Sequence, residues 1–142
     1  MWEGRTMNGN GGNELAPSGA VTAAGVTHVL LSYHYLDTGD IDGYGSLLDE
    51  HAHVSRPDVA VGQGRTQVVG LHADIAGPPA RHHIYKVIAD GDAVVATGRF
   101  TAPPTRGGRA AVDVEFVDVF TLSGKGMLLG YRRFYFAAPS RG

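Results

Sequence analysis

The sequence predicts an α+β fold in which three N-terminal helices cover a cone-shaped, curved antiparallel sheet, in the order ααβαββββ. Helical periodicity dominates the first half of the chain, whereas residues 81–136 have the pattern of two hairpins of long strands. Branched and aromatic residues alternate with polar ones there, so each strand should have an inner and an outer face. A curved sheet covered by helices leaves a cavity, the usual small-ligand site in such a shape.

The helices have local start and stop signals. Residues 18–38 carry one apolar stripe, and Gly39 is placed as the left-handed residue that ends the helix. Asp40 should cap a short second helix. Residues 66–75 form a third helical pattern, which Gly77-Pro78-Pro79 stops.

The strands are bounded by turn residues. A short strand at 52–56 should end at Pro57, and a loop follows at 58–64. Strands 82–89 and 93–101 flank Asp90-Gly91, which supplies the positive φ angles of a two-residue turn. Strands 110–122 and 128–136 flank a second turn at 123–126.

Composition limits the class of protein. The 142 residues suit one domain, expected over 18–138, with a Gly- and Asn-rich tail at 1–17 and a frayed end at 139–142. A net charge of −2 without a basic cluster argues against nucleic acid. The absence of cysteine excludes disulfides and thiolate chemistry, and no apolar run reaches membrane-spanning length. We expect a cytoplasmic protein that needs no cofactor and binds no membrane.

Three segments together resemble a known family. They are YLDTGDID at 35–42, HVSRP at 53–57 followed by GQGR at 62–65, and FVDVFTL at 116–122 with YRRFYF at 131–136. In this order they resemble the SnoaL-like branch of the nuclear-transport-factor-2-like superfamily. The resemblance covers about residues 21–136 and extends to small members from enediyne and aromatic polyketide gene clusters.

That branch includes polyketide cyclases, ketosteroid isomerases, epoxide hydrolases, dehydratases and catalytically silent binding proteins. The tyrosine, base and acid of the isomerases resemble Ser32, Arg56 and Asp118 here, so only the acid is retained. Arginine cannot abstract a proton, which argues against isomerisation. The epoxide hydrolases need a carboxylate where Arg133 stands, which argues against that activity as well.

Strand register decides which side chains line the cavity. If Leu122 pairs with Met127, Asp118 lies opposite Tyr131, and one set of residues shares a face of the hairpin. The position that resembles Asp118 faces the cavity in the ketosteroid isomerases, so the resemblance implies that this set lines the cavity. This set comprises Phe116, Asp118, Phe120, Leu129, Tyr131, Arg133 and Tyr135. If Ala89 pairs with Asp92, the inner face of the other hairpin carries Arg81, His83, Tyr85 and Val87, and His82 points away. The opposite set would be outside or in a dimer contact; it comprises Asp113, Glu115, Val117, Val119 and Arg132.

Two interpretations of Asp118 stay open: a carboxylate neutralised by Arg133, or a general acid or base whose pKa burial raises. Arg133 is either that partner or a clamp for a substrate oxygen. His53 is the imidazole best placed for proton transfer. His51 and His53 share a strand face without a third ligand in phase, so no metal site is expected. Other candidate substrate-binding residues are Tyr131, Tyr135, His83, Tyr85, Phe116, Phe120, Ser32 and Ser55.

The first functional hypothesis is a cofactor-free cyclase, dehydratase or aldol-type catalyst acting on a hydrophobic, oxygenated, polyketide-like ligand. Asp118 and His53 would exchange protons, while Arg133, Tyr131 and Tyr135 would orient a carbonyl and stabilise the enolate. The second is a non-catalytic protein that binds such a ligand in the same cavity. The third is a protein-interaction module that uses the outer sheet face, which we also expect to form a homodimer.

Overall fold

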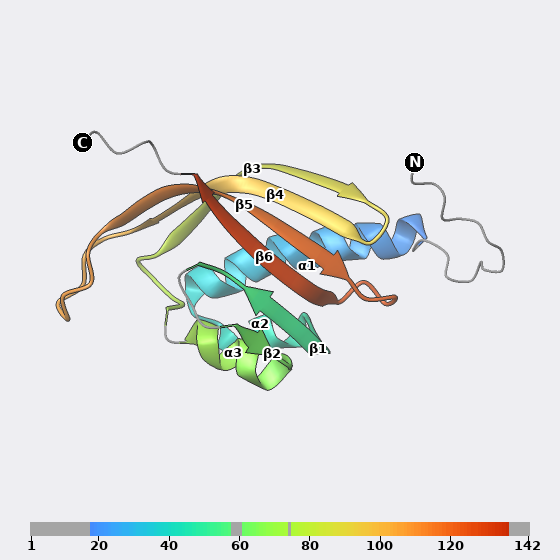
Figure 1. Ribbon diagram of the computed structural model, residues 1–142, viewed down its shortest axis with the longest axis horizontal. Coiled ribbons are helices and arrows are strands. Elements are labelled where there is room, and N and C mark those ends of the chain that lie inside the picture. Colours follow the sequence, from blue (N-terminus) through green and yellow to red (C-terminus); the bar gives the residue numbers. More distant parts are fainter. Residues whose placement is uncertain (1–17, 58–60, 74, 137–142) are drawn as a thin grey trace.

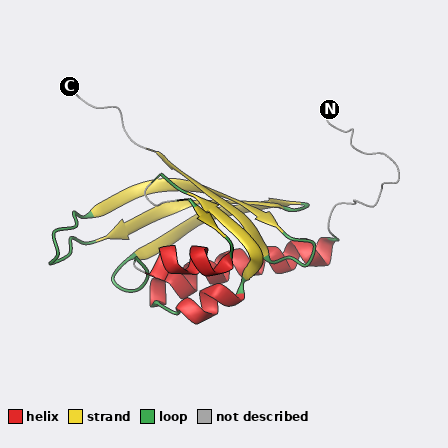
Figure 2. Cartoon of the chain, turned by 60° about the horizontal axis from the view of Figure 1, so that its bottom comes forward, coloured by secondary structure: helices red, strands yellow, loops and turns green. Residues whose placement is uncertain are grey.

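The computed structural model describes residues 18–57, 61–73 and 75–136, and the expectations for 1–17 and 139–142 lie outside them. The helices lie against one face of a curved sheet, as Figures 1 and 2 show. The predicted α+β class is therefore confirmed. The elements are α1 (Gly19–Thr38), α2 (Ile41–Ser46), β1 (Leu48–Ser55), β2 (Gly62–Gln63), α3 (Arg65–Ala73), β3 (Arg81–Asp90), β4 (Ala93–Ala102), β5 (Val112–Leu122) and β6 (Leu128–Phe136).

The helix boundaries follow the capping residues. The Ser18 hydroxyl accepts from the Val21 amide at the start of α1, and Gly39 ends the helix with φ 78°. The Asp40 carboxylate accepts from the Gly43 amide and caps α2. The Gly39 stop and the Asp40 cap are as the sequence predicts, because each depends on residues within one helical turn. Helix α3 begins one residue earlier than predicted and ends at Ala73 rather than at 75.

The sheet contains a strand and a parallel pairing that the sequence pattern does not show. Its order is β2-β1-β6-β5-β4-β3, and β1 runs parallel to β6 while the other neighbours are antiparallel. Strand β1 begins at Leu48, four residues before the predicted start, and β2 occupies part of the predicted loop. The turn after α2 thus leads directly into the sheet.

The register of β5 and β6 differs from the predicted one by two residues. Asp118 pairs with Arg133 rather than with Tyr131, and Phe116 pairs with Tyr135. One residue of the shift arises at the turn, where Leu122 pairs with Leu128 instead of Met127, and an irregularity between Thr121 and Leu122 adds the second. Because the side-chain period of a strand is two, the aromatic, acidic and basic side chains stay on the inner face.

A bulge in β3 reverses the predicted faces of its first half. Ile84 pairs with Gly98 but Lys86 pairs with Thr97, so Tyr85 is the extra residue. His82 therefore faces the helices, where its side chain is 6% exposed. His83 is exposed and Tyr85 is 58% exposed, so their predicted inward orientation is wrong.

Candidate functional site

The centre of the inner face is a buried ion pair between neighbouring strands. The Arg133 Nε donates to Asp118 Oδ1 at 2.7 Å, and Nη2 donates to Oδ2 at 2.8 Å. Their side chains are 1% and 0% exposed. The guanidinium also lies 4.1 Å from the centroid of the Phe116 ring. Two parallel bonds fix the plane of the guanidinium and leave only Nη1 uncommitted to Asp118.

Two tyrosines complete the shell around Asp118. The Tyr33 hydroxyl donates to Oδ2 at 2.6 Å, and the Tyr131 hydroxyl donates to the same atom at 3.3 Å. Burial raises the pKa of both phenols well above the usual range, and the Asp118 charge raises it further, so both stay protonated donors. Four donors to two oxygens leave Asp118 little capacity to accept a substrate proton. The geometry favours the neutralised carboxylate over the general acid or base.

Tyr33 is a component of the site that the sequence patterns do not single out. The resemblance points to Ser32, but the Ser32 hydroxyl is buried against its own helix and donates to the Val29 carbonyl at 2.6 Å. Tyr33 lies one turn after Val29 in the apolar stripe of α1. That position on the buried stripe, opposite the strand that carries Asp118, is the signal that could identify it.

A second, part-buried pair joins the end of α1 to the start of β3. The Asp37 Oδ1 lies 2.6 Å from His82 Nδ1, and Oδ2 accepts from the His82 amide at 2.8 Å. Burial lowers the pKa of His82, an effect that the bond to Asp37 opposes. The ring packs against Tyr33 and Phe100, at centroid distances of 5.0 Å and 4.7 Å. Sequence reasoning misses this pair because the bulge at Tyr85 is not apparent from the strand pattern.

Further polar side chains gather at the end of β1. Arg56 is 8% exposed, and its Nη2 donates to the Tyr135 hydroxyl at 3.0 Å. His72 of α3 is buried, with Nδ1 3.0 Å from the Val68 carbonyl and 3.3 Å from the Tyr44 hydroxyl. Arg56 occupies the position where the resemblance expects a base, and it lines the cavity beside Arg133.

The interior of the cone is largely filled by aromatic side chains. One cavity of about 20 Å³ remains beside Arg133, and one of about 10 Å³ lies nearer α2. Each holds about one water-sized group. In the part of the chain that the structure describes, Arg133 Nη1 is buried without a hydrogen-bond partner. The first cavity is lined by Leu36, Asp37, Arg56, His72, Ile75, Ala76, Ala80, His82, Phe100 and Arg133.

Several predicted site residues do not join this cluster. His53 and Ser55 are exposed on the outer face of β1, because Ala52, Val54 and Arg56 take the inward positions. His53 touches the smaller cavity only at its edge, beside Gly130. Tyr85 donates to Glu115 Oε2 at 3.1 Å on the outer face. Asp118, Arg133, Tyr131, Tyr135, Phe116 and Phe120 do lie together on the inner face.

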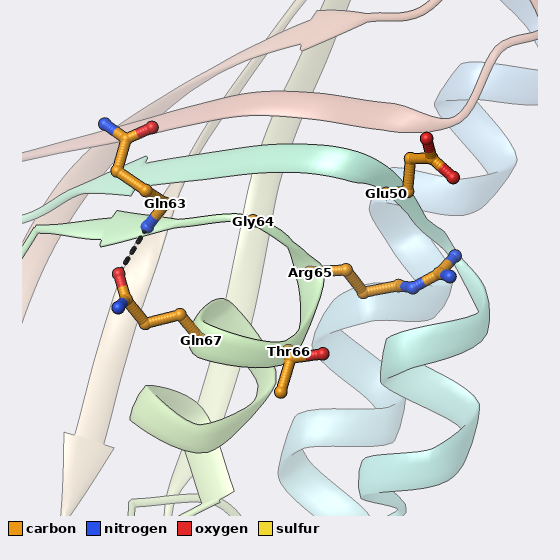
Figure 3. Close-up of a pocket in the computed structure, with 6 residues that line it drawn as sticks. All are labelled: Glu50, Gln63, Gly64, Arg65, Thr66 and Gln67. Carbon is orange, nitrogen blue, oxygen red and sulfur yellow. Dashed lines mark hydrogen bonds between the residues drawn. The ribbon is translucent and has the colours of Figure 1, made fainter.

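The larger hollows are on the surface. Figure 3 shows a polar groove of about 530 Å³ at the start of α3, where the Gln67 side chain accepts from the Gln63 amide at 2.7 Å. Arg65 reaches from this groove to the Leu48 carbonyl at 3.4 Å. A neighbouring hollow of about 550 Å³ shares Glu50 and Arg65. Both are open to solvent and enclose no ligand-sized volume.

Metal and membrane sites are not evident. Among the described residues, no three His, Cys, Asp or Glu side chains are grouped so that they could hold a metal ion. None of the described helices has the length and apolarity to cross a bilayer.

Comparison with known proteins identifies the family. The model of the SnoaL-like domain family matches residues 29–128. The chain belongs to the SnoaL-like domain family. No curated protein matches it significantly.

Solved structures agree with this SnoaL-like fold. A protein assigned as a SnoaL-like polyketide cyclase from Jannaschia sp. CCS1 is 22% identical, with a TM-score of 0.69, over 83% of this chain and 89% of that one. Bal32a, from a soil-derived mobile gene cassette, is 21% identical with a TM-score of 0.70, over 82% and 92%. TerC, co-crystallised with polyporic acid, is 19% identical with a TM-score of 0.67, over 80% and 92%. At these identities the likeness shows the fold alone.

Proposed function

We propose that this SnoaL-like protein binds a hydrophobic, oxygenated molecule of the polyketide type, with a carbonyl or enolate oxygen against Arg133. We further propose that it acts on this ligand as a cyclase-, dehydratase- or aldol-type catalyst without a cofactor. The observation that carries the proposal is the buried Nη1 of Arg133, which has no hydrogen-bond partner among the described residues and whose side chain lines a cavity.

An unpaired buried donor is costly. Leaving such a group unsatisfied costs about 1–3 kcal/mol, and more where the group is charged. The cost is regained when a ligand brings an acceptor oxygen to it. A fixed guanidinium is also suited to the negative charge that develops on an enolate oxygen. Asp118 keeps it in place without using Nη1.

The size of the cavity limits how the ligand enters. About 20 Å³ accepts a carbonyl group but not a ring system. The body of the ligand would therefore lie at the apolar side of the cavity, over Ile75, Ala76 and Phe100. These side chains are half-buried and would move apart as the ligand binds.

Family membership supports the ligand class. The description of one structure of the same fold, from Jannaschia, names a SnoaL-like polyketide cyclase, and another, TerC, was co-crystallised with polyporic acid. The narrower expectations of an enediyne substrate and a cytoplasmic location stay predictions.

One observation favours the non-catalytic alternative, in which the protein only binds the ligand. Asp118, the acid expected to exchange protons, is held by Arg133, Tyr33 and Tyr131. His53, its expected partner, lies on the other face of the sheet. If no other base serves the cavity, the site can orient a carbonyl but cannot abstract a proton.

A pair of alanine substitutions tests the binding site. Ala76 lines the cavity, whereas Ala73 is exposed at the end of α3, so Ala76→Leu should fill the entrance and Ala73→Leu should not. With polyporic acid as the probe, we expect calorimetry to show binding to the wild type and to Ala73→Leu, and at least tenfold weaker binding to Ala76→Leu. Equal binding to both variants, or no binding to the wild type, contradicts the proposal.

We also propose that two copies pair through the outer sheet face. It exposes apolar side chains on three strands: Val117 is 38% exposed, Phe134 46%, Ile88 55% and Phe136 67%. Exposed apolar side chains grouped on one face are typical of association surfaces. This arrangement supports a homodimer and leaves the inner site of each copy free.

A further inference from the structure

The Asp37–His82 pair has the geometry of a catalytic dyad. Asp37 lies in the last turn of α1, and His82 is the second residue of β3. The ring nitrogen Nδ1 and the backbone amide of His82 each bond one carboxylate oxygen, at 2.6 Å and 2.8 Å. Two bonds from one residue to one carboxylate fix both the position and the rotation of the imidazole.

The partners of the ring define its tautomer. An ionised carboxylate only accepts, so the proton of a neutral His82 is on Nδ1 and the lone pair is on Nε2. Among the residues that the structure describes, Nε2 receives no hydrogen bond. Burial lowers the pKa of His82, which keeps the ring neutral near pH 7 and its Nε2 able to accept a proton.

The cavity places this imidazole beside the uncommitted guanidinium. His82 and Arg133 both line the 20 Å³ cavity. Both also pack on the same two rings: His82 lies 4.7 Å and 5.8 Å from the centroids of Phe100 and Phe116, and Arg133 lies 5.9 Å and 4.1 Å from them. A group that enters the cavity thus meets a neutral base and a fixed cation.

We propose that Nε2 of His82 is the general base of the proposed reaction, and that Asp37 positions it. With the ligand carbonyl against Arg133, Nε2 removes a proton from the adjacent carbon. The C–H electron pair becomes the C=C bond of the enolate, and the carbonyl π pair moves to the oxygen beside Arg133. The proton remains on Nε2, and Asp37 stabilises the resulting imidazolium. This assignment rests on the proposed function.

The other groups at the cavity are consistent with these roles. Arg56, Arg133 and His72 line it together with Asp37, and Asp118 lies behind Arg133. The two arginines favour an anionic enolate and disfavour a cationic His82, whereas Asp37 and Asp118 have the opposite effect on the ring. Burial is the largest of these effects, so the resting ring is neutral, as a base that must accept a proton requires.

A structural alternative assigns the pair only to holding α1 against β3. Both roles require Asp37 to bond His82, so a loss of stability in a variant does not separate them. The rate of proton transfer and its pH dependence do separate them, because a purely structural contact contributes to neither.

The test uses the acetoacetyl thioester of N-acetylcysteamine, a minimal β-ketoacyl probe whose α-proton exchange in D2O is followed by proton NMR. We expect the wild type to accelerate exchange and His82→Gln to lower the rate at least 100-fold, within the range for removal of a general base. His53→Gln, the matched exposed histidine, should stay within twofold of the wild type. Asp37→Asn should shift the midpoint of the pH–rate profile.

A second measurement avoids dependence on folding of the variants. Nitrogen-15 NMR of histidine-labelled wild type at pH 7 should show His82 neutral, with the proton on Nδ1. A proton on Nε2, an imidazolium, or equal exchange by wild type and His82→Gln overturns the dyad. If the wild type does not bind polyporic acid, the proposed ligand-binding site is contradicted instead. The binding site and the dyad can therefore fail separately.

Discussion

The substitution Asp118→Asn should strongly destabilise the protein. Asp118→Asn retains the shape and an acceptor oxygen for Tyr33, but removes the charge that neutralises Arg133. Both side chains are inaccessible to solvent, at 0% and 1% exposure. Two unit charges ~4 Å apart interact by ~4 kcal/mol at an effective dielectric constant near 20. Breaking a buried pair by removing one partner costs about 3–5 kcal/mol, which agrees.

The sheet provides a matched control. Arg99 and Asp113 form the same two-bond pair on neighbouring strands, with both distances at 2.6 Å. Their side chains are 49% and 58% exposed, so solvent competes for both charges. Asp113→Asn should therefore have a far smaller effect than Asp118→Asn, although the hydrogen-bond geometry is equivalent.

Urea denaturation followed by far-ultraviolet circular dichroism measures the unfolding free energy of both variants. For a chain of this size, a loss of 3–5 kcal/mol corresponds to a fall of about 10–20 °C in Tm. The double variant Asp118→Asn/Arg133→Met should lose less than the sum of the two single losses, because no unpaired cation remains. If Asp118→Asn costs no more than Asp113→Asn, burial is not what makes the pair important, and the reasoning is refuted.

Four further predictions follow from other contacts. Tyr33→Phe removes a donor to a charged carboxylate and should cost about 1.5–3 kcal/mol of unfolding free energy in urea. The far-ultraviolet circular dichroism spectrum of the folded protein should not change. Above pH 10 the unfolding free energy should fall by about 1.4 kcal/mol per pH unit for each buried tyrosine, because those phenols ionise only when unfolded; a flat profile between pH 9 and 11 contradicts this. Gly98→Ala would drive a methyl group against the His83 carbonyl and should cost about 1–3 kcal/mol, whereas Gly70→Ala meets nothing within 4 Å and should be neutral or stabilising in the same denaturation assay. Phe134→Asp should convert a dimer into a folded monomer in light scattering, and an unchanged mass contradicts the outer-face interface.

Local signals account for the parts of the fold that the sequence predicts. The Asp40 cap, the Gly39 stop and the turn at Gly91 depend on residues within a few positions of each other. The parallel pairing of β1 with β6 joins segments that are more than 70 residues apart, and no local pattern specifies it. The short β2 likewise exists only because β1 offers it an edge.

The site is predicted correctly only where the strand phase is uninterrupted. Asp118 and Arg133 face inward because the shift between β5 and β6 is even. In β3 the bulge at Tyr85 adds one residue, so His83 and Tyr85 exchange faces with His82. Gly98 is the available sequence signal: a glycine within a strand indicates a bulge or a close backbone approach, and here a β-carbon would meet the His83 carbonyl.

The two carboxylates on the inner side of the sheet, buried Asp118 and part-buried Asp37, have opposite consequences for their partners. Asp118 pairs with a group that stays charged, which fixes a cation at the cavity wall. Asp37 pairs with an imidazole whose pKa burial lowers, which leaves a neutral ring with a free lone pair. Environments that push titratable groups toward different charge states are the arrangement that acid–base catalysis needs. Asp118, the expected acid, thus supports Arg133, and in the proposed reaction proton transfer is assigned to His82, which only the β3 bulge turns inward.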